Sequence, residues 1–166
     1  NKDTVIVVGE RGKIRRTVNG AQPPFDTINA GKPQHLVDVV FVSPSTGYTA
    51  RDSGVIKTTD YGATWASVLN NSGKVYKLTS ISYDKASVSS VYSFSDYNLA
   101  TCTNVFWSTT NAGVTWAENT TAAGNHCLPL DFHMVSTSAM YVVGGTGKIL
   151  KSTDGGTTWA AQTSGT

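Results

Sequence analysis

The sequence is poor in charged residues. Lysine, arginine, aspartate and glutamate together make up 14% of its 166 residues, whereas an ordinary soluble domain contains about 25%. A helical bundle requires much glutamate, lysine, leucine and alanine, so this shortage disfavours one. The net charge of +2 is too small for an electrostatic nucleic-acid binder, and the basic residues form no long run. We therefore expect no nucleic-acid partner.

Long apolar segments are also missing. No stretch approaches the ~18 to 20 apolar residues of a membrane span, and no charged-then-apolar signal segment stands at the start. Because the chain begins with Asn1 and not with Met, we expect that a leader or a preceding domain has been removed or left out. We predict an exported protein, extracellular and secreted or on a virion surface, with no membrane span.

Cysteine and histidine are scarce. Cys102 and Cys127 are the only cysteines, too few for a disulfide scaffold, or for a zinc site without two further ligands. They can form one disulfide in an oxidising compartment or remain two buried thiols, and the sequence leaves both alternatives open. The linear spacing of His35, His126 and His133 matches no metal motif. We predict no metal site and no cofactor.

What the sequence has instead is serine, threonine, asparagine and 16 glycines, with 10% aromatic residues. This composition suits many short strands joined by polar turns, and no window shows a sustained helical period. An octapeptide Ser/Thr-x-Asp-x-Gly-x-Thr-Trp occurs at 58–65 and 152–159, and at 109–116 with Asn in the Asp place. Its defining residues are Thr58, Asp60, Gly62, Trp65, Thr109, Asn111, Gly113, Trp116, Ser152, Asp154, Gly156 and Trp159. Three copies in so short a chain establish an internal repeat.

A worn fourth copy lies near the start, where Val7-Val8-Gly9 and Gly12-Lys13-Ile14 match Val142-Val143-Gly144 and Gly147-Lys148-Ile149 at one constant offset. The copies recur every ~40 to 50 residues, the period of a four-stranded propeller blade. We therefore predict an all-β, single-domain, small β-propeller of four blade-like repeats, roughly 1–30, 31–70, 71–122 and 123–166. In this alignment the first repeat begins on the second strand of its blade. Its innermost strand is missing, and an unfilled edge invites pairing.

The residues of the octapeptide are those of a turn. An Asp or Asn side chain two residues before Gly accepts backbone N–H groups across the bend, and Gly adopts a conformation that other residues resist. The Ser/Thr hydroxyl joins this network. Trp begins the next strand and places its ring between blades. The motif therefore predicts turns between the third and fourth strands of the blades.

These octapeptides resemble Asp-box repeats, also called BNR repeats, which occur in sialidases and in many non-catalytic propellers. The longer pattern adds an apolar strand and then Gly47-Tyr48-Thr49-Ala50 or Tyr141-Val142-Val143-Gly144 before the octapeptide. It is most similar to the photosystem II assembly-factor-like propellers. The resemblance covers essentially the whole chain and implies a non-enzymatic binding scaffold, with the Asp boxes at the blade periphery, away from the ligand face.

The acidic and basic residues offer little for catalysis. A sialidase-type site needs three converging arginines, but the four arginines all lie in the first third of the chain, and only two glutamates are present. Asp60 and Asp154 belong to the turn motif. Asp38 and Asp131 occupy matching places at the start of inner strands, which predicts a repeated structural role. We therefore expect no enzymatic activity.

The linkers between blades and the turns joining second to third strands are expected to form one polar, mildly basic face. Candidate ligand-binding residues on it are Arg11, His35, Arg51, Asp52, Tyr76, Lys77 and His126. The predicted function is a non-catalytic binding or assembly module that recognises a glycan or a protein through this face. The alternative is a structural protein of an extracellular or virion assembly that self-associates with neighbouring copies, and a glycoside hydrolase ranks third.

Overall fold

The structure of the chain, a computed structural model, describes residues 3–31, 33–70, 78–97, 104–121 and 129–165. These residues form fifteen strands in four antiparallel sheets. The first sheet contains β1 (Val5–Val8), β2 (Lys13–Thr17) and β3 (Asp26–Asn29). The second contains β4 (Leu36–Phe41), β5 (Gly47–Arg51), β6 (Gly54–Thr58) and β7 (Ala66–Asn70). The third contains β8 (Leu78–Asp84), β9 (Ser87–Tyr97), β10 (Asn104–Thr109) and β11 (Ala117–Thr121).

The fourth sheet contains β12 (Pro129–Met134), β13 (Met140–Gly144), β14 (Ile149–Ser152) and β15 (Ala160–Gln162). Two short 3-10 turns, η1 (Glu10–Gly12) and η2 (Gly145–Gly147), join β1 to β2 and β13 to β14. Among the residues described, no helix is long and apolar enough to cross a membrane.

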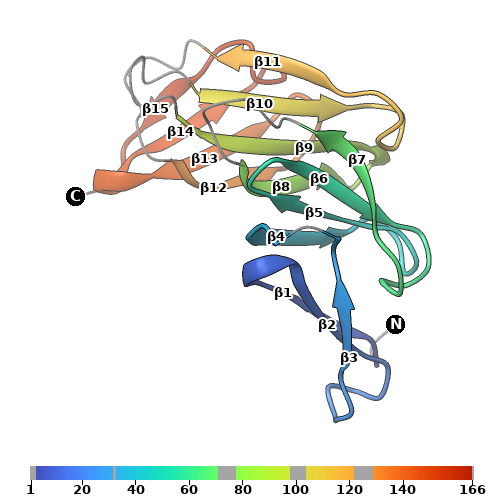
Figure 1. Cartoon of the computed structure of the whole chain (residues 1–166). Coiled ribbons are helices and arrows are strands. Elements are labelled where there is room, and N and C mark those ends of the chain that lie inside the picture. The colour runs from blue at the N-terminus through green and yellow to red at the C-terminus, as the bar shows by residue number, and fades with distance from the viewer. Residues whose placement is uncertain (1–2, 32, 71–77, 98–103, 122–128, 166) are drawn as a thin grey trace.

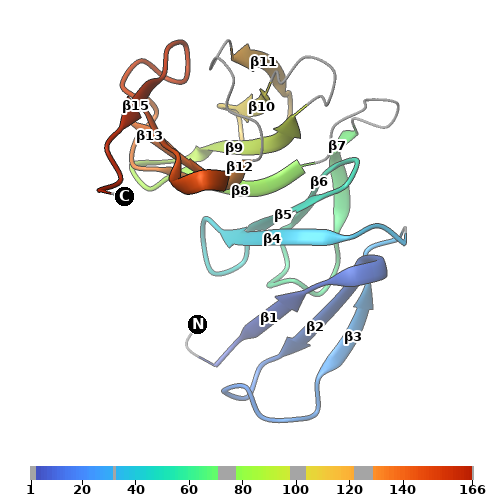
Figure 2. The same cartoon turned by 90° about the vertical axis from the view of Figure 1, so that its left-hand side faces the viewer.

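The four sheets follow one another in chain order along an arc, with the first sheet at one end and the fourth at the other (Figure 1 and Figure 2). The first strands of neighbouring sheets are joined directly. Ile81 N on β8 donates to Asp38 Oδ2 on β4 at 2.9 Å, and Met134 N on β12 donates to Ser82 Oγ on β8 at 3.1 Å. These contacts make β4, β8 and β12 the inner strands of three consecutive blades, with β8 between β4 and β12. The predicted all-β propeller of four blade-like repeats is confirmed.

The first blade has three strands, as predicted. Val8 on β1 lies opposite Ile14 on β2, in the register that places Val143 opposite Ile149 between β13 and β14. Strand β1 therefore occupies the place of a second strand, and in the part of the chain that the structure describes no strand pairs with its other edge. Val7 on this strand is 54% exposed.

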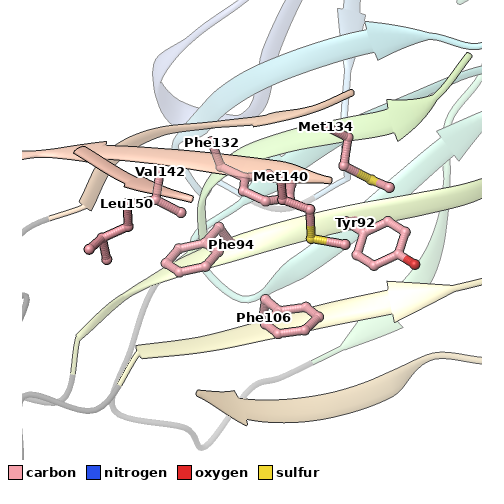
Figure 3. Packing of buried hydrophobic residues seen from close by; sticks show 8 residues of the cluster. All are labelled: Tyr92, Phe94, Phe106, Phe132, Met134, Met140, Val142 and Leu150. Carbon is pink, nitrogen blue, oxygen red and sulfur yellow. The ribbon is translucent and has the colours of Figure 1, made fainter. Parts of the chain in front are cut away.

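Apolar clusters fill the spaces between consecutive blades. Successive residues of one strand serve different clusters, because side chains of a strand alternate between its faces. Val55 on β6 belongs to the cluster shared with the third blade, whereas the next residue, Ile56, belongs to the cluster shared with the first blade. The cluster between the third and fourth blades is rich in rings and contains Tyr92, Phe94, Phe106, Phe132, Met134, Met140, Val142 and Leu150 (Figure 3). Each such fully buried side chain contributes about 1.5–3 kcal/mol.

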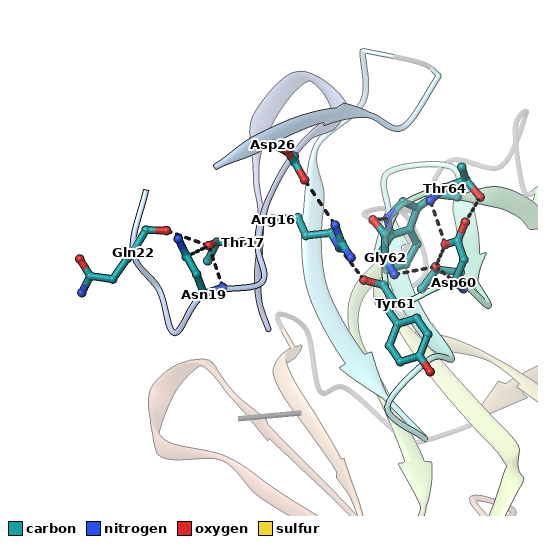
Figure 4. A network of polar contacts seen from close by, with 11 residues as sticks. Arg16, Thr17, Asn19, Gln22, Asp26, Asp60, Tyr61, Gly62 and Thr64 are labelled. Atoms are coloured by element: carbon teal, nitrogen blue, oxygen red, sulfur yellow. Dashed lines mark hydrogen bonds and ion pairs between the residues drawn. The ribbon is translucent and has the colours of Figure 1, made fainter. Parts of the chain in front are cut away.

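The Asp-box turns join third to fourth strands, as predicted. In the second blade, Asp60 Oδ1 accepts the backbone N–H of Thr64 at 2.9 Å, and Asp60 Oδ2 accepts the Thr64 hydroxyl at 2.6 Å (Figure 4). The Thr58 hydroxyl donates to Asp60 Oδ1 at 2.8 Å. Asp154 makes the same set of bonds in the fourth blade, and Asn111 replaces the carboxylate in the third. The turn thus satisfies backbone donors locally and fixes the start of the outer strand.

The tryptophans of the motif lie against the preceding blade. Trp65 donates its indole N–H to the carbonyl oxygen of Gly62 at 3.1 Å and packs on the cluster of the first and second blades. Trp159 does the same with Gly156 and stands edge-on to Phe94 of the third blade. Each ring therefore seals a joint, as expected. It directly precedes the outer strand, which begins one residue later, rather than opening it.

Two consecutive residues in each Asp-box turn have left-handed backbone, namely Tyr61 and Gly62, Ala112 and Gly113, and Gly155 and Gly156. The worn first repeat keeps this feature in Gly20 and Ala21, with φ of 72° and 69°. Gly20 N donates to Asp3 O at 2.8 Å, just as Tyr61 N donates to Ser45 O at 3.0 Å. Gly20 therefore takes the place of Tyr61 although the Gly-x-Thr-Trp ending is absent.

Candidate functional site

The linker between the first two blades is held between two turns. Gly12 N in the β1–β2 turn donates to Gln34 O at 2.6 Å, and Leu36 N donates back to Gly9 O at 3.0 Å. From the second blade, Asp52 N donates to His35 O, and Asp52 Oδ2 accepts His35 N, both at 3.2 Å. Linker and turns therefore form one face here, as expected. The exposed side chains of Arg11 and His35 lie on it, and their role in binding stays a prediction.

Arg51 does not lie on the surface of this face, which corrects the expected position. Its side chain is only 4% exposed, because β5 runs through the middle of the second sheet. Arg51 Nη2 donates to Ser67 Oγ at 2.9 Å, while the buried Nε has no partner among the described residues. Desolvation by burial lowers the pKa of this guanidinium. Arg51 therefore lies buried below this face and bonds to the outer strand of its own blade.

Several predicted residues lie outside the described part of the chain. These are Tyr76, Lys77 and His126, together with the two cysteines, Cys102 and Cys127. Their candidate roles in ligand binding and disulfide formation stay predictions. Among the residues that the structure does describe, no group of three or more histidine, cysteine, aspartate or glutamate side chains could hold a metal ion.

An open cavity of about 460 Å³ lies against the first blade, lined by Val7, Val8, Gly9, Glu10, Arg11, Lys13 and Arg15. Three cationic side chains and one carboxylate surround it, and all four residues are exposed. Arg11 is held in the left-handed conformation, with φ of 57°, inside the turn η1. Arg15 Nη1 donates to Thr27 Oγ1 at 2.5 Å, which holds the guanidinium against the sheet. Val7 and Val8 in its lining belong to β1, the strand whose other edge is unpaired among the described residues.

Lys13 and Arg15 were not among the predicted binding residues. The signal for them is strand alternation, because Lys13 and Arg15 flank the fully buried Ile14 and so project from the opposite face of β2. Arg15 lies directly opposite Val7 on β1. Both residues therefore point away from the second blade, into the space that a preceding blade would fill.

The inner strands meet around two carboxylates. The Ser80 hydroxyl on β8 lies 3.0 Å from Asp131 Oδ1 and 3.2 Å from Asp38 Oδ2. Asp38 Oδ1 also accepts the N–H of Val39, and Asp131 Oδ1 accepts the N–H of Phe132. The predicted repeated structural role of the two aspartates is confirmed by these matching bonds.

Three further carboxylates, those of Asp60, Asp84 and Asp154, accept backbone N–H groups. Asp84 is 4% exposed and accepts N–H groups from Ala86 at 2.8 Å and from Thr137 of the fourth blade at 2.9 Å. Hydrogen bonds from the side chain and backbone of Thr64 lower the pKa of Asp60 to about 2. Bonds from Thr158 lower the pKa of Asp154 in the same way. Asp60 and Asp154 therefore remain ionised acceptors at neutral pH.

No protein-family model and no curated protein sequence matches the chain. Solved structures do match it. YCF48 bound to D1 peptide is similar with a TM-score of 0.69 and 18% identity, over 84% of this chain and 44% of that one. The GH74 enzyme of Niastella koreensis gives 0.72 and 16%, over 92% and 27%. YCF48 from Cyanidioschyzon merolae gives 0.60 and 20%, over 77% and 37%.

The chain spans less than half the length of each of these proteins. At such identities the likeness concerns the fold, and its neighbours include both a peptide-bound protein and glycoside hydrolase family enzymes. Together with the Asp-box turns at the blade periphery, it gives the chain the β-propeller fold of the Asp-box type, similar in structure to YCF48 and to the GH74 propellers.

Proposed function

We propose that the chain is a non-catalytic binding module that recognises an acidic protein segment at the cavity of the first blade. The observation that carries this proposal is the set of three exposed cations, Arg11, Lys13 and Arg15, around one cavity beside an open strand edge. Guanidinium groups bind carboxylates through paired hydrogen bonds. Glu10 is the one carboxylate in the lining, so the cavity keeps a net positive charge.

The edge of β1 supplies a second means of recognition. An extended segment laid along an unpaired edge bonds to it through its main chain, while its side chains enter neighbouring pockets. At the cavity, acidic side chains of such a segment reach Arg11 and Arg15, and an apolar side chain covers Val7, which is 54% exposed. This combination favours a protein segment over a glycan, and no aromatic ring lines the cavity to stack on a sugar.

The fourth blade shows that these cations are special to the first. In the matched sequence, Thr146 stands in the place of Arg11 and Leu150 in the place of Arg15, and only Lys148 keeps the charge of Lys13. Thr146 even shares the left-handed backbone of Arg11, with φ of 60° against 57°. The blade fold therefore does not require the two arginines, which leaves them available for a ligand.

Two further aspects belong to the same proposal. The absence of catalysis is supported by the described carboxylates Asp38, Asp84 and Asp131, which accept backbone N–H groups and shape the joints between blades. The extracellular or virion-surface location is proposed from the low charge and the Ser/Thr/Gly-rich sequence.

The test is a titration of fluorescently labelled peptides by anisotropy. A glutamate- and aspartate-rich peptide is compared with its glutamine and asparagine counterpart and with an anionic polysaccharide. We expect binding of the acidic peptide that weakens as salt rises, since exposed charges are screened. The double variant Arg11→Ala, Arg15→Ala should bind about tenfold or more weakly, as charged hydrogen bonds are lost.

The matched control is Lys148→Ala, which removes the equivalent lysine of the fourth blade and should leave the affinity unchanged. Equal affinity of the double variant and the wild type would refute the cavity as the site. Binding of the polysaccharide but of neither peptide would instead support glycan recognition.

A further inference from the structure

Side chains of one blade donate hydrogen bonds to a carbonyl oxygen in the Asp-box turn of the next blade. We call this set of donors the hook. Between the second and third blades, the Tyr48 hydroxyl donates to the carbonyl oxygen of Ala112 at 2.9 Å, and Lys57 Nζ donates to the same oxygen at 2.8 Å. Between the first and second blades, Arg16 Nε donates to the carbonyl oxygen of Tyr61 at 2.9 Å (Figure 4). Tyr61 and Ala112 are the first left-handed residues of their turns.

The fourth blade repeats this hook on its outward side. Tyr141 lies opposite Lys151 in the register of β13 and β14, just as Tyr48 lies opposite Lys57 between β5 and β6. Lys151 Nζ stands 5.6 Å from the Tyr141 ring centroid, and Lys57 Nζ stands 5.5 Å from the Tyr48 ring centroid. The same pair of side chains is thus held in the same arrangement.

This face points away from the third blade. Side chains of β13 and β14 that contact the third blade are Met140, Val142 and Leu150, which alternate with Tyr141, Val143 and Ile149. Val143 is 41% exposed, whereas its counterpart in the second blade, Ala50, is fully buried by the third blade. The fourth sheet is the last in the arc (Figure 2). Among the described residues, no further blade covers its hook and the apolar side chains beside it.

We propose that this face binds the first blade of a second copy of the chain, head to tail, with Tyr141 and Lys151 donating to the carbonyl oxygen of that copy's Gly20. We call the side of a blade that points towards the preceding blade its back face. Among the described residues, the first blade is the one blade whose back face is uncovered, and Val7 is exposed on it. Gly20 has the place and the left-handed backbone of Tyr61 and Ala112. The incoming turn therefore presents its carbonyl oxygen as the internal turns do.

Charge complementarity also favours this partner. Asp131 on β12 is exposed on the same face, opposite Val143, and the back face of the first blade carries Arg15 and Lys13. In the second blade, the equivalent Asp38 accepts an N–H from the inner strand of the next blade. Among the residues that the structure describes, the first blade has no inner strand, so an arginine that reaches Asp131 replaces that bond. Lys151 is the cationic group of this fourth-blade face, and the carbonyl oxygen of Gly20 is its acceptor.

A head-to-tail contact of this kind is heterologous, so it closes into a ring or extends into a filament. The contact covers Arg15, and bound acidic peptide and a second copy therefore exclude each other. Both proposals use the first-blade face that carries Arg15, but the inference does not depend on peptide binding, because it is argued from the hook of the fourth blade and the turn at Gly20.

The experiment is sedimentation velocity over a series of concentrations, with circular dichroism to verify folding. We expect the average sedimentation coefficient of the wild type to rise with concentration. Lys151→Glu blocks the fourth-blade face and Arg15→Glu blocks the first-blade face, so each variant alone should be monomeric. Mixed, they should form a one-to-one dimer through their intact faces. Tyr141→Phe, a conservative change, should weaken association of the wild type about tenfold, and Lys148→Glu should not affect it.

A wild type that stays monomeric at every concentration would overturn the proposal. Association that survives both charge reversals would assign it to another surface, and a variant that dimerises alone would show a symmetric contact instead. Peptide binding by the Lys151→Glu variant is measured in parallel, so that failure of one proposal is distinguished from failure of the other.

Discussion

Tyr48 of the second blade donates its hydroxyl hydrogen to the carbonyl oxygen of Ala112 in the third blade, 2.9 Å away. The ring itself is fully buried. This one side chain therefore packs between the two blades and also bonds to the Asp-box turn of the third. The bond joins residues far apart in sequence and helps to fix the position of the third blade relative to the second.

Replacing Tyr48 with Phe should lower the free energy of unfolding by about 1 kcal/mol, because one hydrogen bond is lost while the ring stays. Urea denaturation followed by tryptophan fluorescence measures it. Tyr141→Phe is the matched control, since the same residue in the fourth blade lies on the outward face. That control should change stability by less than about 0.5 kcal/mol in the monomer. Equal losses in the two variants would contradict the hook.

A methyl group added at Gly156 should be strongly destabilising. The residue has φ of 87°, and a Cβ there would stand 2.7 Å from Phe106 Cζ. Gly156→Ala therefore combines left-handed strain of about 1–2 kcal/mol with overpacking of about 1–3 kcal/mol. Gly155→Ala is the control, because Ala112 already occupies the equivalent place in the third blade. Thermal melts should show the larger drop for Gly156→Ala, and the opposite order would disprove the collision.

Loss of the Asp38 carboxylate should loosen the inner strands. Asp38→Ala leaves the N–H of Ile81 without its acceptor, which is expected to cost about 1–3 kcal/mol. Asp26→Ala, which removes an exposed ion pair with Arg16 at 3.3 Å, should cost no more than about 1 kcal/mol. Chemical denaturation of both variants gives the comparison. If Asp38→Ala were as stable as Asp26→Ala, the carboxylate would have no role in joining β4 to β8.

The Asp boxes should make stability depend on acid pH. The pKa of Asp60 is lowered from 3.8 to about 2 in the folded chain by its bonds to Thr64. A depressed carboxylate pKa contributes stability above the unfolded value, and this contribution is lost as pH falls from about 4 towards 2. Asp154 acts in the same direction.

The double variant Asp60→Asn, Asp154→Asn tests this, because Asn111 already performs the role with bonds to Thr115. Melting temperatures at neutral pH should be close to those of the wild type. Between about pH 4 and pH 2 the variant should lose less stability than the wild type. Parallel loss in the two proteins would mean that other groups cause the acid dependence.

The blades and their turns could be predicted because their determinants are local. The spacing of Thr58, Asp60 and Gly62 encodes one turn, and its recurrence reveals the repeat. The matching positions of Asp38 and Asp131 likewise revealed a repeated structural role. The missing strand of the first blade followed from counting strands against the period.

The candidate site was less predictable because it depends on packing between segments. Arg51 sits at the end of a strand near a turn, where sequence suggests exposure, yet Ser67 on β7 and the surrounding sheet cover it. From the sequence, Lys13 and Arg15 are ordinary outward-pointing residues of a strand. Only the structure shows that they line a cavity on the uncovered side of the first blade. The hook of Tyr141 and Lys151 is visible only once the strand register is known.

The most direct test of the proposed binding site is a ¹H–¹⁵N correlation spectrum of the chain recorded during titration with the acidic peptide. The Lys151→Glu variant is used so that the first blade stays uncovered. The account predicts chemical shift changes concentrated in Val7–Arg15, with little change in the equivalent turn of the fourth blade around Thr146. Shift changes centred on other blades, or none at peptide excess, would contradict it.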